Sequence, residues 1–225
     1  MQVRYVPRFE VDAVLRPDAA LWQAAKPETV KLKGTPLDMQ PSGAIKASWA
    51  EKKIGAVEAV QVAAIHDGER IAFRLEWNDT TENREITDDT PFPDGCGILF
   101  PTVQFAPMAV MGAIGMAVNA WYWRADENGR GRHVLAEGLG TTRTIDEELV
   151  QGNGVHENQR WHVVITRPMQ VKVGSEKPAQ FEPGQSTGFG VAIWEGGRGE
   201  RAGIKAISGD DWIPLDLEAT AEAKA

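Results

Sequence analysis

The sequence contains one cysteine, Cys96, among its 225 residues. A single thiol excludes an internal disulfide, a four-cysteine iron–sulfur cluster and the paired thioether bonds that attach a c-type haem. Any haem bound to this chain is therefore expected to be held without covalent bonds.

Basic charge and long apolar runs are also scarce. Lys and Arg total 24 against 32 Asp and Glu, and the net charge of -8 argues against a nucleic-acid partner. The longest weakly polar run, residues 105–123, is interrupted by proline, glycine and asparagine, so no membrane span is expected. Residues 1–8 are charged and contain Pro7, and they show no apolar segment of an export signal.

Alternation of apolar and polar residues dominates the readable segments. This two-residue period predicts strands, and the pair Asp67-Gly68 predicts a hairpin turn between the first two. The predicted strands cover residues 59–65, 70–77, 97–100, 118–123, 161–166 and 188–194. We therefore expect an all-β fold, a single β-sandwich of mainly antiparallel strands.

Helical signals are short and confined to residues 18–25 and 146–150. With 42% apolar residues the chain can fill one core, and no shift in composition divides it. We therefore expect one domain over residues 1–225, with residues 218–225 forming a frayed tail.

One methionine and one lysine stand out because of their neighbours in the sequence. Met111 lies in a segment rich in Gly and Met that also holds Met108 and Met116, and Lys205 stands among apolar residues. Methionine usually fills gaps in a core, and lysine usually extends its amine to water. Residue type alone therefore leaves both a packing role and a ligand role open.

The four histidines are the obvious rival metal ligands. His66 is predicted in a turn, and His133 and His156 are predicted in loops, so we expect these three to be solvated. His162 follows Trp161 on a predicted strand, where a hydrogen-bonded side chain is the expected role.

Several separate motifs occur in an order that resembles the ethylbenzene dehydrogenase family of haem b γ-subunits. This family includes the small subunits of dimethylsulfide dehydrogenase, selenate reductase and chlorate reductase. The resemblance extends from about Leu21 to Leu217. The motifs are the run 92–101 (FPDGCGILFP), Met111-Gly112, the run 118–126 (VNAWYWRAD) and the run 203–208 (GIKAIS).

The resemblance implies a haem b pocket at one end or edge of the sandwich, with Met111 and Lys205 as the two axial iron ligands. Met116 is the alternative methionine, because Ala113-Ile114 and Met116-Ala117 replace two proline-containing pairs that the family usually has here. A lysine amine binds iron only when it is deprotonated. Two protein ligands leave no open position on the iron, which favours electron transfer over catalysis.

The resemblance also implies an assembly. It predicts an iron–sulfur β-subunit and a molybdopterin catalytic α-subunit as partners, and an external electron carrier such as a soluble cytochrome. This chain would not be catalytic on its own. A periplasmic location is implied, and the lack of a visible export signal leaves a cytoplasmic one open. Four arginines are candidate partners of the haem propionates: Arg124, Arg130, Arg132 and Arg143.

A second function class also fits a β-sandwich. The chain has eight Trp, and exposed Trp rings could stack on sugars in a carbohydrate-binding module. This alternative gives no reason for Lys205 among apolar neighbours.

Overall fold

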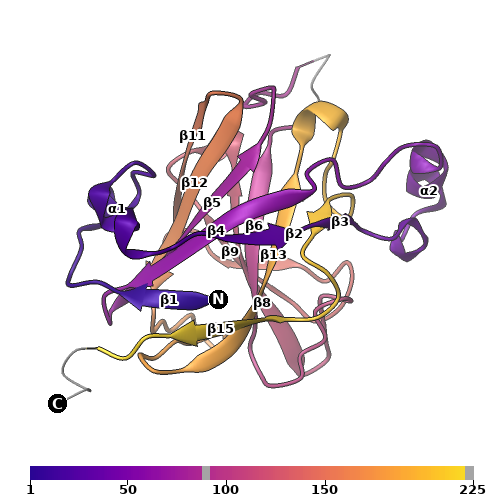
Figure 1. Cartoon of the computed structure of the whole chain (residues 1–225). Coiled ribbons are helices and arrows are strands. Elements are labelled where there is room, and N and C mark those ends of the chain that lie inside the picture. The colour runs from indigo at the N-terminus through magenta and orange to yellow at the C-terminus, as the bar shows by residue number, and fades with distance from the viewer. Residues whose placement is uncertain (88–91, 221–225) are drawn as a thin grey trace.

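Strands dominate the computed structural model, which describes residues 1–87 and 92–220 (Figure 1). The strands are β1 (Gln2–Tyr5), β2 (Glu28–Lys31), β3 (Lys33–Gly34), β4 (Ala59–His66), β5 (Arg70–Asn78), β6 (Gly95–Pro101), β7 (Gly112–Ala113), β8 (Met116–Arg124), β9 (Arg132–Ala136), β10 (Arg143–Asp146), β11 (Gln151–Glu157), β12 (Arg160–Pro168), β13 (Ser186–Trp194), β14 (Ala206–Ile207) and β15 (Ile213–Leu217). The helical pieces are α1 (Val11–Val14), α2 (Gly43–Trp49) and the 3-10 turns η1 (Ala20–Ala24), η2 (Leu37–Met39), η3 (Ala125–Glu127) and η4 (Gly196–Arg198).

One hydrogen-bonded path runs through most strands, in the order β10-β9-β8-β6-β13-β15-β1-β4-β5-β12-β11. Strand β13 belongs to both halves of this path, because residues 186–189 pair with β15 and residues 190–194 pair with β6. Pairing is antiparallel except where β1 lies between β15 and β4. The predicted all-β fold with mainly antiparallel strands is confirmed.

The two halves of the path pack face to face around an aromatic core. Phe73 of β5 contacts Trp121 of β8 with ring centroids 5.9 Å apart, and Trp123 of β8 contacts Trp161 of β12 at 5.1 Å. All four side chains are buried. Contacts between large rings from opposite sheets give the sandwich its common core.

The outer faces of the two sheets also carry apolar residues. On one, Trp22 of η1 is buried against β4, β5 and β12. On the other, small and medium residues of β6, β8, β9 and β13 form a separate cluster that includes Leu99, Ala120 and Val134. This second outer face forms the floor of the cavity described below.

The predicted hairpin is confirmed, whereas the two predicted helices differ from the structure. The hairpin of β4 and β5 forms as expected around Asp67, whose carboxylate accepts the backbone N–H groups of Glu69 and Arg70. The helix expected over residues 18–25 is the 3-10 turn η1. The helix expected over residues 146–150 is wrong, because Asp146 ends β10 and its carboxylate caps a bend by accepting two backbone N–H groups.

Two histidines expected in solvent are buried. His66 ends β4 and His133 lies in β9, and both side chains have 0% exposure. Burial lowers the pKa of His133 to about 4, helped by the charge of Arg167, and it also lowers the pKa of His66. His156 lies in β11 and is half-buried rather than in a loop.

The C-terminal segment is anchored where the frayed tail was expected to begin. The backbone N–H of Glu218 donates to Val3, and its carboxylate accepts the backbone N–H of Tyr5. Residues 221–225 of the expected tail lie outside the described residues. In the part of the chain that is described, no helix is long and apolar enough to cross a membrane.

Candidate functional site

A cavity of about 570 Å³ lies on the outer face of the β9-β8-β6-β13 sheet and reaches the β14–β3 edge. Its floor is made of short side chains, including Gly97, Leu99, Ala120 and Ala192. The alternating positions of the same strands carry large rings, such as Trp121, that point into the sandwich core. The strand pleat therefore places bulk inside the sandwich and leaves a shallow apolar floor outside.

Four chain segments far apart in sequence form the walls. These are the segment 35–41 after β3, the loop around Met108 and Met111, the segment 139–144 and the segment 202–210 that carries Lys205. Most of the lining is apolar, and ligand pockets of about 300–1,000 Å³ usually combine such walls with a few polar groups. This cavity is therefore of the size and character of a small-molecule or cofactor site.

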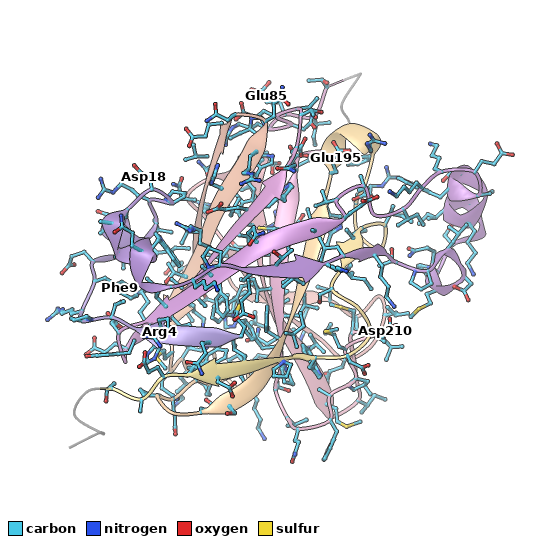
Figure 2. The ribbon with its side chains drawn as sticks, viewed as in Figure 1. Arg4, Phe9, Asp18, Glu85, Glu195 and Asp210 are labelled. Carbon is cyan, nitrogen blue, oxygen red and sulfur yellow. The ribbon has the colours of Figure 1, made fainter. Side chains whose placement is uncertain are left out.

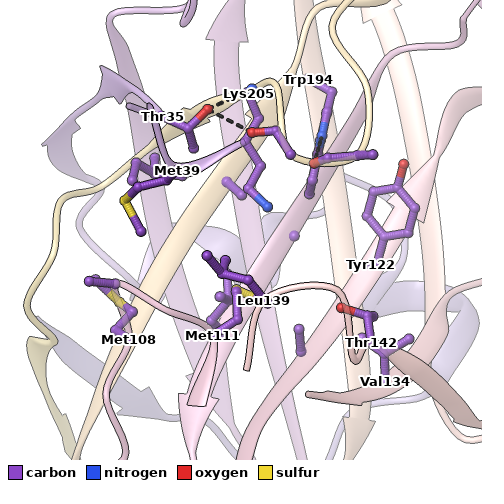
Figure 3. Close-up of a pocket in the computed structure, with 18 of the residues that line it drawn as sticks. Thr35, Met39, Met108, Met111, Tyr122, Val134, Leu139, Thr142, Trp194 and Lys205 are labelled. Carbon is purple, nitrogen blue, oxygen red and sulfur yellow. Dashed lines mark hydrogen bonds between the residues drawn. The ribbon is translucent and has the colours of Figure 1, made fainter. Parts of the chain in front are cut away.

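Lys205 extends its side chain into this cavity (Figure 3). Its backbone is fixed by Thr35, whose N–H donates to the Lys205 carbonyl at 3.0 Å and whose Oγ1 accepts the Lys205 N–H at 3.4 Å. Within residues 1–87 and 92–220, Nζ has no hydrogen-bond or ion-pair partner. Burial lowers the pKa of the Lys205 amine to about 8.

The Trp194 ring lies beside the amine, and Tyr122 packs against that ring. Nζ of Lys205 lies 5.0 Å from the ring centroid of Trp194. Trp194 is itself fixed by its indole N–H, which donates to the Ala202 carbonyl at 3.0 Å, and by an edge contact with Tyr122 at 4.9 Å. Burial raises the pKa of the Tyr122 phenol well above its usual range, so Tyr122 is neutral. A cation over the Trp face is electrostatically favoured, and this contact offsets part of the cost of desolvating Lys205.

Met111 lies across the cavity from Lys205 (Figure 3). Its backbone has a φ of +60°, which is uncommon for a residue with a side chain. Its N–H donates to the carbonyl of Met108, and its own carbonyl accepts the N–H of Gly138. This tight turn directs Met111 onto the apolar cluster of the floor.

The other methionines differ from Met111 in position. Met116 begins β8, is 37% exposed and does not line the cavity. Met108 lines the cavity, but its sulfur packs so closely on Gly190 that a Cβ there would lie 2.5 Å from Sδ. Met39 of η2 also lines the cavity. None of the four histidines does.

Only one of the four candidate arginines, Arg132, lines the cavity, and Glu127 holds its guanidinium by two hydrogen bonds. Sequence reasoning missed the Thr35 side of the cavity and the role of Tyr122. Thr35 stands in no pattern that signals a site, and Tyr122 lies in the family run 118–126 without a sign that it lines the cavity, since both contributions depend on strand pairing across the molecule.

The Trp residues do not form an exposed platform. Five of the eight are buried, and Trp49, Trp194 and Trp212 are half-buried. The carbohydrate alternative depended on exposed Trp rings, and the structure offers none.

Solved structures with a similar fold are carbohydrate-binding proteins. A family 9 carbohydrate-binding module from Caldicellulosiruptor kristjanssonii, in complex with cellotriose, is 8% identical with a TM-score of 0.53, covering 100% of this chain and 97% of that one. A Bacteroides uniformis protein, whose name assigns it as carbohydrate-binding, is 12% identical with a TM-score of 0.54, covering 97% of this chain and 98% of that one. At such low identity the likeness shows the β-sandwich fold alone.

Sequence relatives are subunits of reductases. The γ-subunit of chlorate reductase from Ideonella dechloratans is 33% identical over 198 residues, which is 87% of this chain and 77% of that protein. A Haloferax mediterranei protein, whose name assigns it as the haem subunit of a respiratory nitrate reductase, is 31% identical over 174 residues. That match covers 77% of this chain and 60% of the relative. The sequence model of the ethylbenzene dehydrogenase family matches residues 19–148 and 137–206, and the chain belongs to this family.

Proposed function

We propose that this chain binds haem b non-covalently and relays electrons as the γ-type subunit of a molybdenum oxidoreductase. The observation that carries the proposal is the Lys205 amine, which enters an apolar cavity without a hydrogen-bond partner among the described residues. Such an amine is costly in a packed core and useful as a metal ligand. The names of the two sequence relatives, a reductase γ-subunit and a haem subunit, support the same function.

The residues of the cavity fit a haem. Lys205 and Met111 lie on opposite sides of it and would hold the haem iron, with Met111 preferred to Met116 because Met111 lines the cavity and Met116 does not. Lowering of the Lys205 pKa to about 8 by burial reduces the cost of deprotonating the amine for ligation. The short side chains of the floor leave room for a flat ring system, and Arg132 lies at the lining where it would reach a carboxylate.

When bound, the haem would supply one-electron chemistry. Thr35 would hold Lys205 in place through its two backbone hydrogen bonds, and the apolar walls would exclude water from both ligands. A site closed by two protein ligands suits electron transfer and leaves substrate chemistry to another subunit. The proposed partners are an iron–sulfur β-subunit, a molybdopterin α-subunit and an external carrier such as a soluble cytochrome, and the proposed location is the periplasm.

Optical spectra of purified variants test this proposal. We expect the wild type to bind one haem b per chain with a low-spin spectrum. Lys205→Ala and Met111→Ala should each lose haem or become high-spin, because each removes an axial ligand. Met116→Ala is the matched control and should keep the wild-type spectrum. A low-spin spectrum that survives Lys205→Ala would contradict the proposed ligand, and a protein that takes up no haem would contradict the function.

A further inference from the structure

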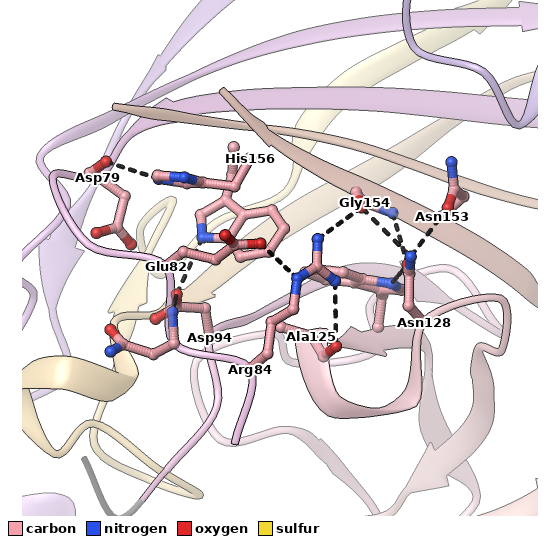
Figure 4. A network of polar contacts seen from close by, with 12 residues as sticks. Asp79, Glu82, Arg84, Asp94, Ala125, Asn128, Asn153, Gly154 and His156 are labelled. Atoms are coloured by element: carbon pink, nitrogen blue, oxygen red, sulfur yellow. Dashed lines mark hydrogen bonds and ion pairs between the residues drawn. The ribbon is translucent and has the colours of Figure 1, made fainter. Parts of the chain in front are cut away.

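Three carboxylates gather at one end of the sandwich, away from both sheet faces. Each stands where a strand begins or ends. Asp79 follows β5, Asp94 precedes β6, and Glu195 follows β13 beside η4 (Figures 2 and 4). Their side chains supply oxygen atoms that all lie within 4.8 Å of one another. Exposure is 6% for Asp79, 0% for Asp94 and 7% for Glu195, so more than nine-tenths of each is buried.

The protein satisfies these carboxylates only in part. Asp94 accepts three hydrogen bonds, from the Trp161 indole at 3.0 Å and from the backbone N–H groups of Asn83 and Gly196 at 2.9 and 2.8 Å. Asp79 accepts two through Oδ1, from the N–H and the hydroxyl of Thr81, and its buried Oδ2 accepts none.

The Glu195 carboxylate has fewer polar partners than those of Asp79 and Asp94. Its buried Oε2 accepts no hydrogen bond, and its ion-pair partner is Arg198, whose Nε lies 3.3 Å away on a side chain that is 71% exposed. A buried carboxylate oxygen without a partner carries a large desolvation cost. Oδ2 of Asp79 accepts no hydrogen bond, and Oε2 of Glu195 has only the ion pair with the exposed Arg198, so the cluster is incompletely satisfied.

The pKa values follow from this arrangement. Burial, with repulsion from Asp79, raises the pKa of Asp94 to about 6 and that of Glu195 to about 7. Burial also raises the pKa of Asp79 against smaller lowering effects from Thr81, His156 and the Trp77 indole. The charge of a bound cation would remove this penalty.

We propose that Asp79, Asp94 and Glu195 form a binding site for a Ca²⁺ ion. The cluster offers oxygen and no thiolate or imidazole, which disfavours Zn²⁺. Mg²⁺ keeps several waters and needs octahedral geometry, whereas Ca²⁺ accepts six to eight oxygens in flexible arrangements. A desolvated set of protein oxygens therefore suits Ca²⁺ better.

Further oxygens lie close to the cluster. A Cβ on Gly197 would lie 2.7 Å from Oδ1 of Asn83 and 2.8 Å from Oε1 of Glu195. Glycine at this position thus lets an amide oxygen approach the carboxylates. The ion would tie together the ends of β5, β6 and β13, and it would fix the turn that leads from Trp194 to Lys205. This role does not depend on the function proposed above.

Calcium titration of the full chain tests the site. After removal of metals with a chelator, isothermal titration calorimetry with CaCl₂ should give one Ca²⁺ per chain, and Ca²⁺ should raise the thermal unfolding midpoint. Asp79→Asn and Glu195→Gln should each weaken binding by about ten-fold or more, because affinity follows the number of charged ligands. Glu82→Gln removes a nearby exposed carboxylate outside the cluster and should leave binding unchanged.

A second measurement needs no variant. Tb³⁺ can replace Ca²⁺, and the Trp161 indole next to Asp94 should sensitise its luminescence, which added Ca²⁺ should then quench by displacement. A chelator-treated wild type that binds no stoichiometric Ca²⁺ and sensitises no Tb³⁺ would overturn the proposal. Equal affinity for Mg²⁺ would overturn the choice of Ca²⁺, and equal Ca²⁺ binding by Glu195→Gln and wild type would overturn the assigned ligands.

Discussion

Lys205 owes its position to Thr35, a residue 170 positions earlier in the chain. The motif around Lys205 marks the residue, but it does not say what holds the amine away from water. That is done by the pairing of β14 with β3, which brings Thr35 against Lys205, and by Trp194 beneath the amine. The site is therefore assembled by sheet contacts rather than by one local motif.

The pH dependence of haem binding should report this lysine. Protons compete with iron for the amine, so affinity should fall as the pH drops below the Lys205 pKa of about 8. Between pH 9 and pH 6 we expect a loss of about a hundred-fold, measured by haemin titration of the haem-free protein. Lys205→Gln should lack this dependence. Affinity that stays constant over the same range in the wild type would argue against Lys205 as a ligand.

At the residue level, sequence reasoning named both proposed ligands and misjudged the burial of two histidines. Met111 and Lys205 stand in family motifs, and the structure places both at the cavity. His66 and His133 were expected in solvent because their neighbours look like turn and loop residues. His66 is buried because β4 extends one residue beyond the predicted strand, and His133 is buried because it lies in β9, a strand that the alternating pattern did not predict.

The strand β11 shows the same limit at the scale of an element. Its sequence Gly152-Asn153-Gly154 is typical of a loop, yet it pairs with β12 over its whole length. The glycines are needed because Trp123 of the opposite sheet lies against them. Glycine within a strand often marks such a close approach, but the sequence does not identify the approaching residue.

Gly154→Ala tests this packing. The added Cβ would lie 2.3 Å from the Trp123 ring, so we expect the free energy of unfolding to fall by about 1–3 kcal/mol. Gly43→Ala is the matched control, because no atom lies within 4 Å of a Cβ there and the residue begins α2. Urea denaturation of both variants gives the comparison. If Gly154→Ala and Gly43→Ala had the same free energy of unfolding, the packing around Trp123 would have to rearrange to admit the added Cβ.

At the scale of the whole molecule, the carboxylate cluster couples stability to pH. In metal-free protein the raised pKa values of Asp94 and Glu195 mean that the native state binds more protons than the unfolded state between about pH 4 and pH 7. The free energy of unfolding should therefore fall as the pH rises through this window, and level off above it. Asp79, Glu200, Arg198 and His156 contribute to the same field.

Comparison with Glu195→Gln isolates this effect. The variant lacks one titrating carboxyl, so relative to the wild type it should gain about 3 kcal/mol of stability between pH 4.5 and pH 8 in the presence of a chelator. Chemical denaturation at each pH measures the difference, in which the effects of His66 and His133 cancel. A difference that does not change with pH would mean that Glu195 titrates normally in the native protein.

The sequence by itself determined the all-β class, the hairpin of β4 and β5, and the family with its two proposed ligand positions. These are carried by two-residue alternation, turn residues and short motifs, all of which are local. Tertiary structure alone decided where the cavity lies, which methionines line it, and that Asp79, Asp94 and Glu195 meet. Pairing between distant strands and close packing of the core bring such residues together, and no local pattern records which distant strands will pair.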